Sequence, residues 1–212
     1  MTNGYGILSN IKEGIDYEKI NNNQVDVNGP IAMIGAGTGL GHGYLVKHQN
    51  GKYYHVFASE GGHQDFAPKF DLEWRYLEFI KKHYNIEHVS VERACSGPAI
   101  PVMLNFMIES EKMQSEIFKT IEEIHKATPE DIIKFGLEKT CKVCEKVIEF
   151  FVIIYAAAAG NMSLLLLPTG GVYLLGGLSV ALTDYMIKED VFRVNYTFYL
   201  FFYFIFHFRI IS

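Results

Sequence analysis

Cysteine, positive charge and long apolar runs are all scarce in this sequence of 212 residues. Three cysteines, a small and odd number, argue against a disulfide framework and fit a reducing compartment. The net charge of −5 offers no basic surface to nucleic acid, so we expect no DNA or RNA partner. The longest wholly apolar run of the final stretch, 198–206, is far short of the roughly 18 residues of a membrane span. The first residues also lack a signal-peptide pattern, so we expect a cytoplasmic protein with no membrane partner.

Cysteine motifs that could bind a metal are also few. Cys141 and Cys144 form a CKVC motif, which is half of a zinc site at best. The motif lies in a helical Lys/Glu-rich pattern without a second CxxC or a nearby histidine pair. The sequence therefore predicts no metal site.

What the chain does contain is the composition of a globular α/β protein, with 49% hydrophobic and 20% charged residues. In 31–46, two apolar runs flank a glycine-rich turn, which predicts strand, tight turn and strand. The aromatic-rich stretch 52–59 predicts a further strand. The amphipathic stretch 71–84 predicts a helix, with Asp71 able to cap its start.

The second half of the chain is mainly helical in pattern. A short strand at 88–91 is expected to lead through a Gly-Pro turn into a helix, and the helical pattern runs on through 109–159. Within it, Thr128 is expected to cap a helix that begins at Pro129. A buried strand, GVYLLGG, and a last helix follow.

The tail, 191–212, differs in kind from the rest. It is rich in Phe, Tyr and Ile without helical or strand periodicity. It could be an interfacial anchor, a buried strand pair, or translated sequence that is not an evolved protein segment, since A/T-rich codons specify these residues. We favour the third interpretation and treat 191–212 as a possible gene-model artefact outside the domain.

Two polar motifs are candidates for chemistry. The GAGTGLG turn is neither a P-loop nor a convincing dinucleotide fingerprint, but Gly37, Thr38 and Gly39 would let backbone amides and one hydroxyl approach a phosphate. A plain tight turn remains the alternative. In SEGGHQDFAP, Glu60 and His63 are separated by glycines, which disfavours zinc and a rigid acid–base pair.

Glutamates and a histidine are well suited to hydrogen bonding with vicinal hydroxyls. Glu92, in VSVERACSGP, lies at a strand end from which it could converge with Glu60 and His63 on one cleft. Taken singly, Glu92 fits a solvated ion pair and His63 a turn histidine. Taken together, they favour a sugar site.

Four motifs together resemble the bacterial-type glucokinases of the actin/hexokinase ATPase superfamily. They are IAMIGAGTGLGHGYLV, SEGGHQDFAP, VSVERACSGPAI and GNMSLLLLPTGGVYLLGGLS, in this order and spacing. The resemblance implies a partial actin-like (ribonuclease H-like) α/β fold, mainly the large lobe, over 1–190. It also implies phosphoryl transfer from ATP, with Mg²⁺, to the 6-hydroxyl of glucose, the first step of glycolysis.

The resemblance assigns the sugar contacts to Glu60, His63 and Glu92. On the nucleotide side it assigns two groups by motif. The phosphate-binding residues are Gly37, Thr38 and Gly39, and the residues near the adenosine are Gly176 and Gly177.

Two family features have no counterpart in this sequence. They are the first phosphate loop and the catalytic aspartate, which the family carries just before a stretch resembling TNGYGILS. We therefore expect the base upstream of Met1, no catalytic base in this chain, impaired activity, and a possible homodimer only in a full-length form. Asp65 is a tempting base, but the family's base belongs to the upstream segment.

Two alternatives stay open: a non-catalytic sugar-binding remnant, and a kinase for another hexose or an amino sugar. Sugar kinases of the repressor/ORF/kinase group carry a cysteine-rich zinc motif after their EGH-like element, and none follows His63.

Overall fold

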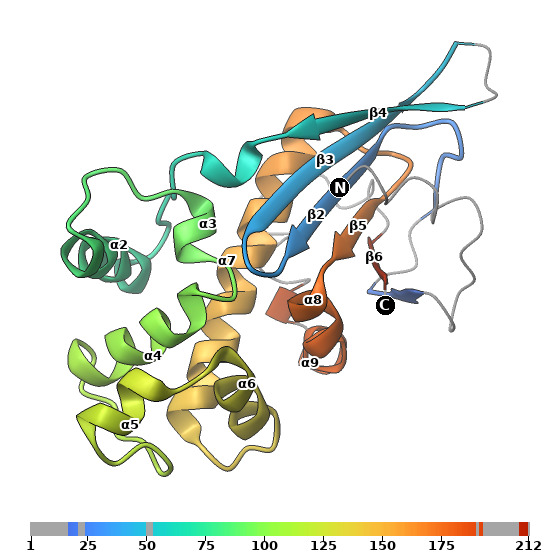
Figure 1. The fold of residues 1–212 in the computed structure, drawn as a ribbon. Helices are drawn as coiled ribbons and strands as arrows, with labels where there is room; N and C mark the ends of the chain where they lie inside the picture. Colours follow the sequence, from blue (N-terminus) through green and yellow to red (C-terminus); the bar gives the residue numbers. More distant parts are fainter. Residues whose placement is uncertain (1–16, 21–23, 50–52, 190, 193–207, 212) are drawn as a thin grey trace.

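A mixed β-sheet and a group of helices, joined by one long helix, make up the computed structural model (Figure 1). The structure describes residues 17–20, 24–49, 53–189, 191–192 and 208–211. Within these ranges the strands are β1 (Tyr17–Lys19), β2 (Ile31–Ala36), β3 (Leu40–Lys47), β4 (Tyr54–Ser59), β5 (Val172–Leu175) and β6 (Phe208–Ile211). Their order in the sheet is β1-β6-β5-β2-β3-β4.

The centre of the sheet carries the predicted glycine-rich hairpin. β2 and β3 pair antiparallel, with Ala36 opposite Leu40, and β4 pairs antiparallel with β3. β5 lies parallel to β2 on its other side, with Gly35 opposite Leu175. The turns that follow β2 and β5 therefore lie at the same edge of the sheet, since parallel strands end on one side. The strands predicted at 31–46 and 52–59 and in GVYLLGG are confirmed.

The helical part follows the hairpin along the chain. Its elements are a short 3-10 helix η1 (Gly61–His63), then α2 (Asp71–Tyr84), α3 (Val91–Ala94), α4 (Ala99–Glu109), α5 (Ile121–Lys126), α6 (Pro129–Leu137), α7 (Lys142–Leu166), α8 (Gly177–Ala181) and α9 (Thr183–Lys188). The predicted cap of α6 is confirmed: the Thr128 hydroxyl accepts a hydrogen bond from the Asp131 N–H at 3.1 Å.

Three local predictions are wrong. Asp71 does not cap α2: Phe70 is the N-cap residue, without a side-chain hydrogen bond, and Asp71 in the first turn pairs with Arg75 instead. The expected strand at 88–91 is reduced to one bridge between Asp65 and Ser90, because α3 begins at Val91. The helical pattern of 109–159 is interrupted by the non-helical segment 110–120 before α5.

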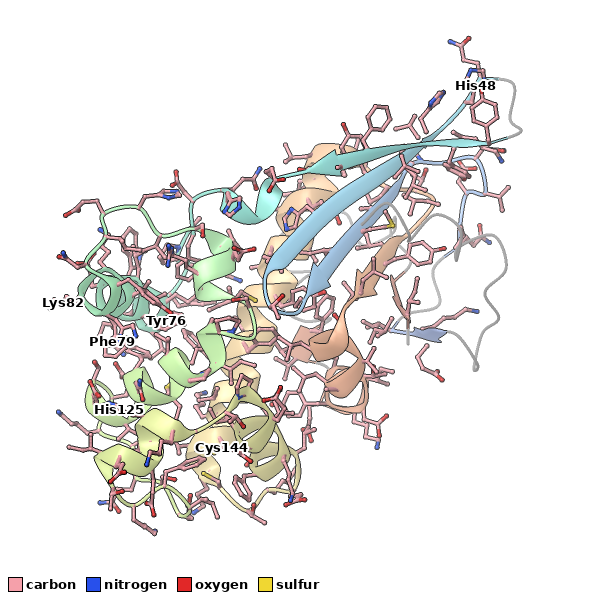
Figure 2. The ribbon with its side chains drawn as sticks, viewed as in Figure 1. His48, Tyr76, Phe79, Lys82, His125 and Cys144 are labelled. Atoms are coloured by element: carbon pink, nitrogen blue, oxygen red, sulfur yellow. The ribbon has the colours of Figure 1, made fainter. Side chains whose placement is uncertain are left out.

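The long helix α7 organises the core. It passes behind the sheet and continues between α4 and α6 (Figure 1). Phe150 of α7 packs against Tyr76 of α2, which Figure 2 labels, with the two ring centres 5.2 Å apart. The Tyr76 ring also lies 5.2 Å from that of Phe106 on α4. The strands β2, β3, β5 and β6 contribute a second, smaller apolar cluster. Its buried members are Ile31, Met33, Leu45, Tyr173 and Ile211.

Parts of the predicted tail fall within the described residues. Phe192 is fully buried, with its ring 6.0 Å from that of Tyr155, and β6 pairs parallel with β5. The apolar run 198–206 lies outside the described residues. The assignment of 191–212 to a separate segment stays a prediction.

Candidate functional site

The glycine turn between β2 and β3 is held by the turn that precedes α4. The N–H of Gly97 donates to the carbonyl oxygen of Gly37 at 2.7 Å. A side chain at Gly97 would place its Cβ 2.9 Å from that same oxygen, so only glycine allows the approach. This contact fixes the SGP turn against GAGTGLG, although the two motifs are far apart in sequence.

Glu92 is attached to the same hairpin. It lies in the first turn of α3, which Ser90 caps by accepting a hydrogen bond from the Arg93 N–H. One carboxylate oxygen of Glu92, Oε2, accepts the N–H of Leu40 at 2.8 Å. A Cβ on Gly39 would lie 2.5 Å from this oxygen, so the glycine makes room for the carboxylate.

The two glycines of SEGGHQDFAP are explained by packing against β3. A Cβ on Gly61 would lie 2.2 Å from Nδ1 of His42, and one on Gly62 would lie 2.1 Å from the carbonyl oxygen of Leu40. The backbone of η1 therefore lies directly on β3, where no side chain fits. This close packing carries Glu60 and His63, at the two ends of the glycine pair, to the edge of the sheet.

His42 lies beneath this turn and is 6% exposed. Burial lowers the pKa of His42 to about 4, because the charged imidazolium would lose its hydration. Its Nε2 is buried without a hydrogen-bond partner among the described residues. His42 is therefore neutral at ordinary pH and acts as a packing support for η1.

Backbone pairing brings His63 and Glu92 together. The N–H of Val91 donates to the carbonyl oxygen of Gln64 at 2.9 Å, and the N–H of Phe66 donates to that of Val89 at 2.8 Å. The segment after η1 thus runs beside the start of α3. His63 Nε2 lies 3.6 Å from Glu60 Oε2, and the two side chains are 61% and 91% exposed.

Two adjoining cavities open at this edge of the sheet. The smaller cavity, of about 220 Å³, is lined by Thr38, His63, Tyr84, Ser90, Glu92, Arg93, Ser96, Pro98 and Ala99. The larger cavity, of about 720 Å³, is lined by Gly37, Thr38, Gly97, Pro98, Pro101, Pro129, Glu130, Ile133, Lys134, Gly177, Leu178 and Ala181. Thr38 and Pro98 line both, so the two cavities are neighbours that share these residues.

Some of the predicted site residues line these cavities, and others lie beside them. His63 and Glu92 line the smaller cavity, Gly37 and Gly177 line the larger one, and Thr38 lines both. The other three predicted residues, Gly39, Glu60 and Gly176, line neither.

Each of those three residues has another place. Gly39 adjoins the carboxylate of Glu92, and Glu60 lies at the rim beside His63. Gly176 has a positive φ of 89°, and a Cβ there would lie 2.4 Å from the carbonyl oxygen of Ala36. Gly176 therefore allows α8 to start close against β2.

Asp65 does not face either cavity. Its carboxylate pairs with Nε2 of His88 at 2.8 Å, and both side chains are mostly exposed. The described residues that line the smaller cavity include no aspartate.

Several lining residues were not predicted. Pro129, Glu130, Ile133 and Lys134 bring one face of α6 to the larger cavity, although the sequence identified only the start of that helix. In the smaller cavity, the guanidinium of Arg93 lies 5.1 Å from the centre of the Tyr84 ring. Arg93 directly follows the predicted Glu92 in the sequence. Nothing in the local sequence of Tyr84 indicated a site.

Comparisons with known proteins show the family. The family model described as glucokinase matches residues 2–197. The chain belongs to the glucokinase family. It is 37% identical to a glucokinase from Synechocystis sp. over 187 residues, which is 83% of this chain and 52% of that protein.

Solved glucokinase structures share the fold. A glucokinase from Balamuthia mandrillaris in complex with glucose superposes with a TM-score of 0.78 at 15% identity, covering 93% of this chain and 55% of that one. A ROK family glucokinase from Streptomyces griseus in complex with glucose and AMPPNP gives 0.56 at 16% identity, covering 83% and 52%. The predicted fold class, a partial actin-like ATPase fold, is confirmed.

The chain spans about half the length of the glucokinases that it matches. Within the described residues, α7 is long and apolar enough to cross a membrane, but 72% of its most apolar window is buried inside this glucokinase-family fold.

Proposed function

We propose that the whole protein transfers the terminal phosphoryl group of ATP to the 6-hydroxyl of glucose in the cytoplasm. The observation that carries this proposal is the pair of adjoining cavities with a shared wall at Thr38 and Pro98. Phosphoryl transfer requires the acceptor hydroxyl and the donor phosphate to be held in line and in contact. Neighbouring cavities support this proposal, because a sugar in one and a nucleotide in the other would lie on the two sides of Thr38 and Pro98.

The smaller cavity is the proposed sugar site. Glu92 retains one carboxylate oxygen after Oε2 has accepted the Leu40 N–H, and that oxygen can accept from a sugar hydroxyl. His63 lines the same cavity and can donate or accept, and Glu60, beside His63, adds a second carboxylate. This set suits vicinal hydroxyls, and the Balamuthia relative is described in complex with glucose.

The larger cavity is the proposed ATP site. The backbone of Gly37 and the hydroxyl of Thr38 would face the phosphates. Pro101, Pro129, Ile133 and Leu178 would enclose the nucleobase in an apolar space. Glu130 is the one carboxylate among the described residues that line this cavity, so Mg²⁺ would enter with the ATP phosphates, as it commonly does.

For catalysis, a base must accept the proton from the sugar's 6-hydroxyl while ADP leaves. The described residues of the smaller cavity provide glutamate and histidine as hydrogen-bonding partners but no aspartate. We therefore propose a second, narrower function for the 212 residues by themselves, which is sugar binding with little turnover. A role as a sugar-binding remnant remains compatible with the same geometry.

Glucose binding to Glu92→Gln, measured by calorimetry, tests the sugar site. The amide oxygen can still accept the Leu40 N–H, so the fold is preserved, while the charged acceptor for the sugar is lost. Affinity should fall by roughly 10-fold to 100-fold, as expected for a hydrogen bond to a charged group. The matched control is Glu122→Gln, an exposed carboxylate of α5, which should bind as the parent does. Equal glucose affinity in all three proteins, or binding by none, contradicts the assignment.

A further inference from the structure

Two buried cysteines at the start of α7 have no part in the proposed reaction. Cys144 Sγ donates a hydrogen bond to Cys141 Sγ at 2.8 Å, and both residues are fully buried. All three cysteines of the chain are free thiols in this structure. Figure 2 places Cys144 on the lower part of α7, beside α6.

The closeness of the sulfurs follows from helix geometry. The side chain of an N-cap residue lies over the third residue of its helix, which is why Ser90, Thr120 and Thr128 each reach the N–H three residues on. Cys141 is the N-cap residue of α7 but makes no such hydrogen bond. Its sulfur instead meets the side chain of Cys144, three residues on.

The surroundings of this pair do not complete a metal site. The described residues contain no group of three or more His, Cys, Asp or Glu side chains placed to hold a metal ion. The Ser115 hydroxyl lies 3.5 Å from Cys141 Sγ, and the carboxylate of Glu116 accepts the N–H of Lys142 at 3.0 Å. Two thiols in contact, without further ligands, suit a two-electron couple better than a metal.

We propose that Cys141 and Cys144 form a reversible oxidation site that closes to an intramolecular disulfide with a small-molecule disulfide as oxidant. Cys141 Sγ attacks one sulfur of the oxidant, the oxidant's S–S bond breaks, and one thiolate leaves. Cys144 Sγ then attacks Cys141 Sγ and expels the second thiolate. Two cysteine thiols are oxidised, one disulfide is reduced to two thiols, and the two cysteine protons go to the leaving thiolates.

The order of attack follows from the two environments. Cys141 Sγ accepts the hydrogen bond of the pair and Cys144 Sγ donates it, so the geometry makes Cys141 the attacking sulfur. Burial and the hydrogen bond to Cys141 raise the pKa of the Cys144 thiol, so Cys144 keeps its proton until the mixed disulfide forms. Because both thiols are buried, exchange requires local opening of the turn before α7, where Lys139 has a positive φ of 55°.

Oxidation of Cys141 and Cys144 would change the shape of the larger cavity, because α6 connects the two places. A Cβ on Gly136 would lie 2.9 Å from the backbone carbonyl oxygen of Cys144, so α6 packs directly on the first turn of α7. Pro129 and Ile133 of the same helix line the larger cavity. A disulfide that tightens this turn therefore displaces a cavity wall, a consequence that rests on the proposed function.

Differential alkylation with peptide mass mapping tests the oxidation site. The folded chain is equilibrated in glutathione buffers of increasing oxidised fraction. The free thiols of Cys141 and Cys144 should disappear together as one disulfide and be recovered with dithiothreitol. Cys95, whose thiol donates to the carbonyl oxygen of Phe151 and not to a second thiol, should stay reduced. Cys95→Ser should behave as the parent does, and Cys141→Ser or Cys144→Ser should form no intramolecular bond. A disulfide that includes Cys95, or a pair that stays reduced at every ratio, overturns the proposal.

Binding of a fluorescent ATP analogue to the reduced and oxidised chains tests the coupling. The oxidised chain should bind about fivefold or more weakly, the lower range of typical coupling between sites. Equal affinity in both states refutes the coupling through α6. Binding in neither state contradicts the proposed ATP site, while the disulfide mapping decides the oxidation site independently.

Discussion

At the scale of single residues, glycines make the space in which the side chains of Glu92 and His42 lie. Gly39 leaves space for the carboxylate of Glu92, and Gly61 leaves space for the imidazole of His42. The proposed sugar site is therefore built from backbone that approaches other atoms too closely for any Cβ. Adding one methyl group at such a position tests the arrangement directly.

Gly39→Ala should weaken glucose binding, because its Cβ would displace the carboxylate of Glu92 from 2.5 Å away. The carboxylate is the flexible end of a side chain, so it can move, and the cost in stability should be limited to the Leu40 hydrogen bond, about 1 kcal/mol. Gly37→Ala is the matched control, since nothing lies within 4 Å of its Cβ. Calorimetry with glucose compares the two, and an undiminished affinity in Gly39→Ala would count against the placement of Glu92.

His42 makes stability depend on pH. Its folded pKa is about 4, below the usual 6.5, so between these values the unfolded chain binds a proton that the folded chain excludes. Stability is therefore full above pH 6.5 and falls as the pH drops toward 4, by on the order of 3 kcal/mol from this group. Urea titrations at several pH values should show a smaller fall for His42→Leu. The same fall in both proteins would contradict the burial of a neutral imidazole.

At the scale of elements, α7 ties the sheet to the helices. The Tyr155 hydroxyl on α7 donates to the carbonyl oxygen of Ile34 on β2 at 3.1 Å and lies 2.8 Å from the Ser179 hydroxyl on α8. The Ser179 hydroxyl in turn donates to the carbonyl oxygen of Leu175 at 2.7 Å. One buried chain of hydrogen bonds therefore joins β2 and β5, the strands whose turns meet at the larger cavity.

Tyr155→Phe should lower the free energy of unfolding by about 1–3 kcal/mol, because buried polar atoms lose their partner. Tyr76→Phe is a close control: Tyr76 is also fully buried, but its hydroxyl has no hydrogen-bond partner among the described residues. Removing that hydroxyl should be neutral or stabilising. Chemical denaturation measures both, and equal losses would show that the Tyr155 hydrogen bonds contribute nothing specific.

At the scale of the whole molecule, two cavities share a wall, while the chain covers about half of its glucokinase relatives. Our proposal places a sugar in the smaller cavity and a phosphate donor in the larger one. It does not place an aspartate in the smaller cavity among the described residues. Our proposal therefore treats sugar binding and turnover as two properties that are measured separately.

The 212-residue chain should bind glucose but form little glucose-6-phosphate. Loss of a general base alone typically lowers the rate by about 10²–10⁴-fold. An assay that couples glucose-6-phosphate formation to NADPH, run beside a full-length glucokinase, measures this. Robust turnover by the chain would show that another group takes the proton and would refute the narrower proposal.

The sequence by itself determined the hairpin, the start of α6 and the family, and it suggested the proposed sugar site. These depend on local signals: glycines at a tight turn, a Thr-Pro helix start, and four motifs in a specific order. Only the tertiary structure decided that Gly97 touches Gly37, that Glu92 holds Leu40, and that α6 lines the larger cavity. Asp71 shows the same limit on a smaller scale, because its pairing with Arg75 and the entry angle of the chain at Phe70 prevailed over its capping tendency. Contacts between segments distant in sequence depend on packing around α7, and no local pattern encodes that packing.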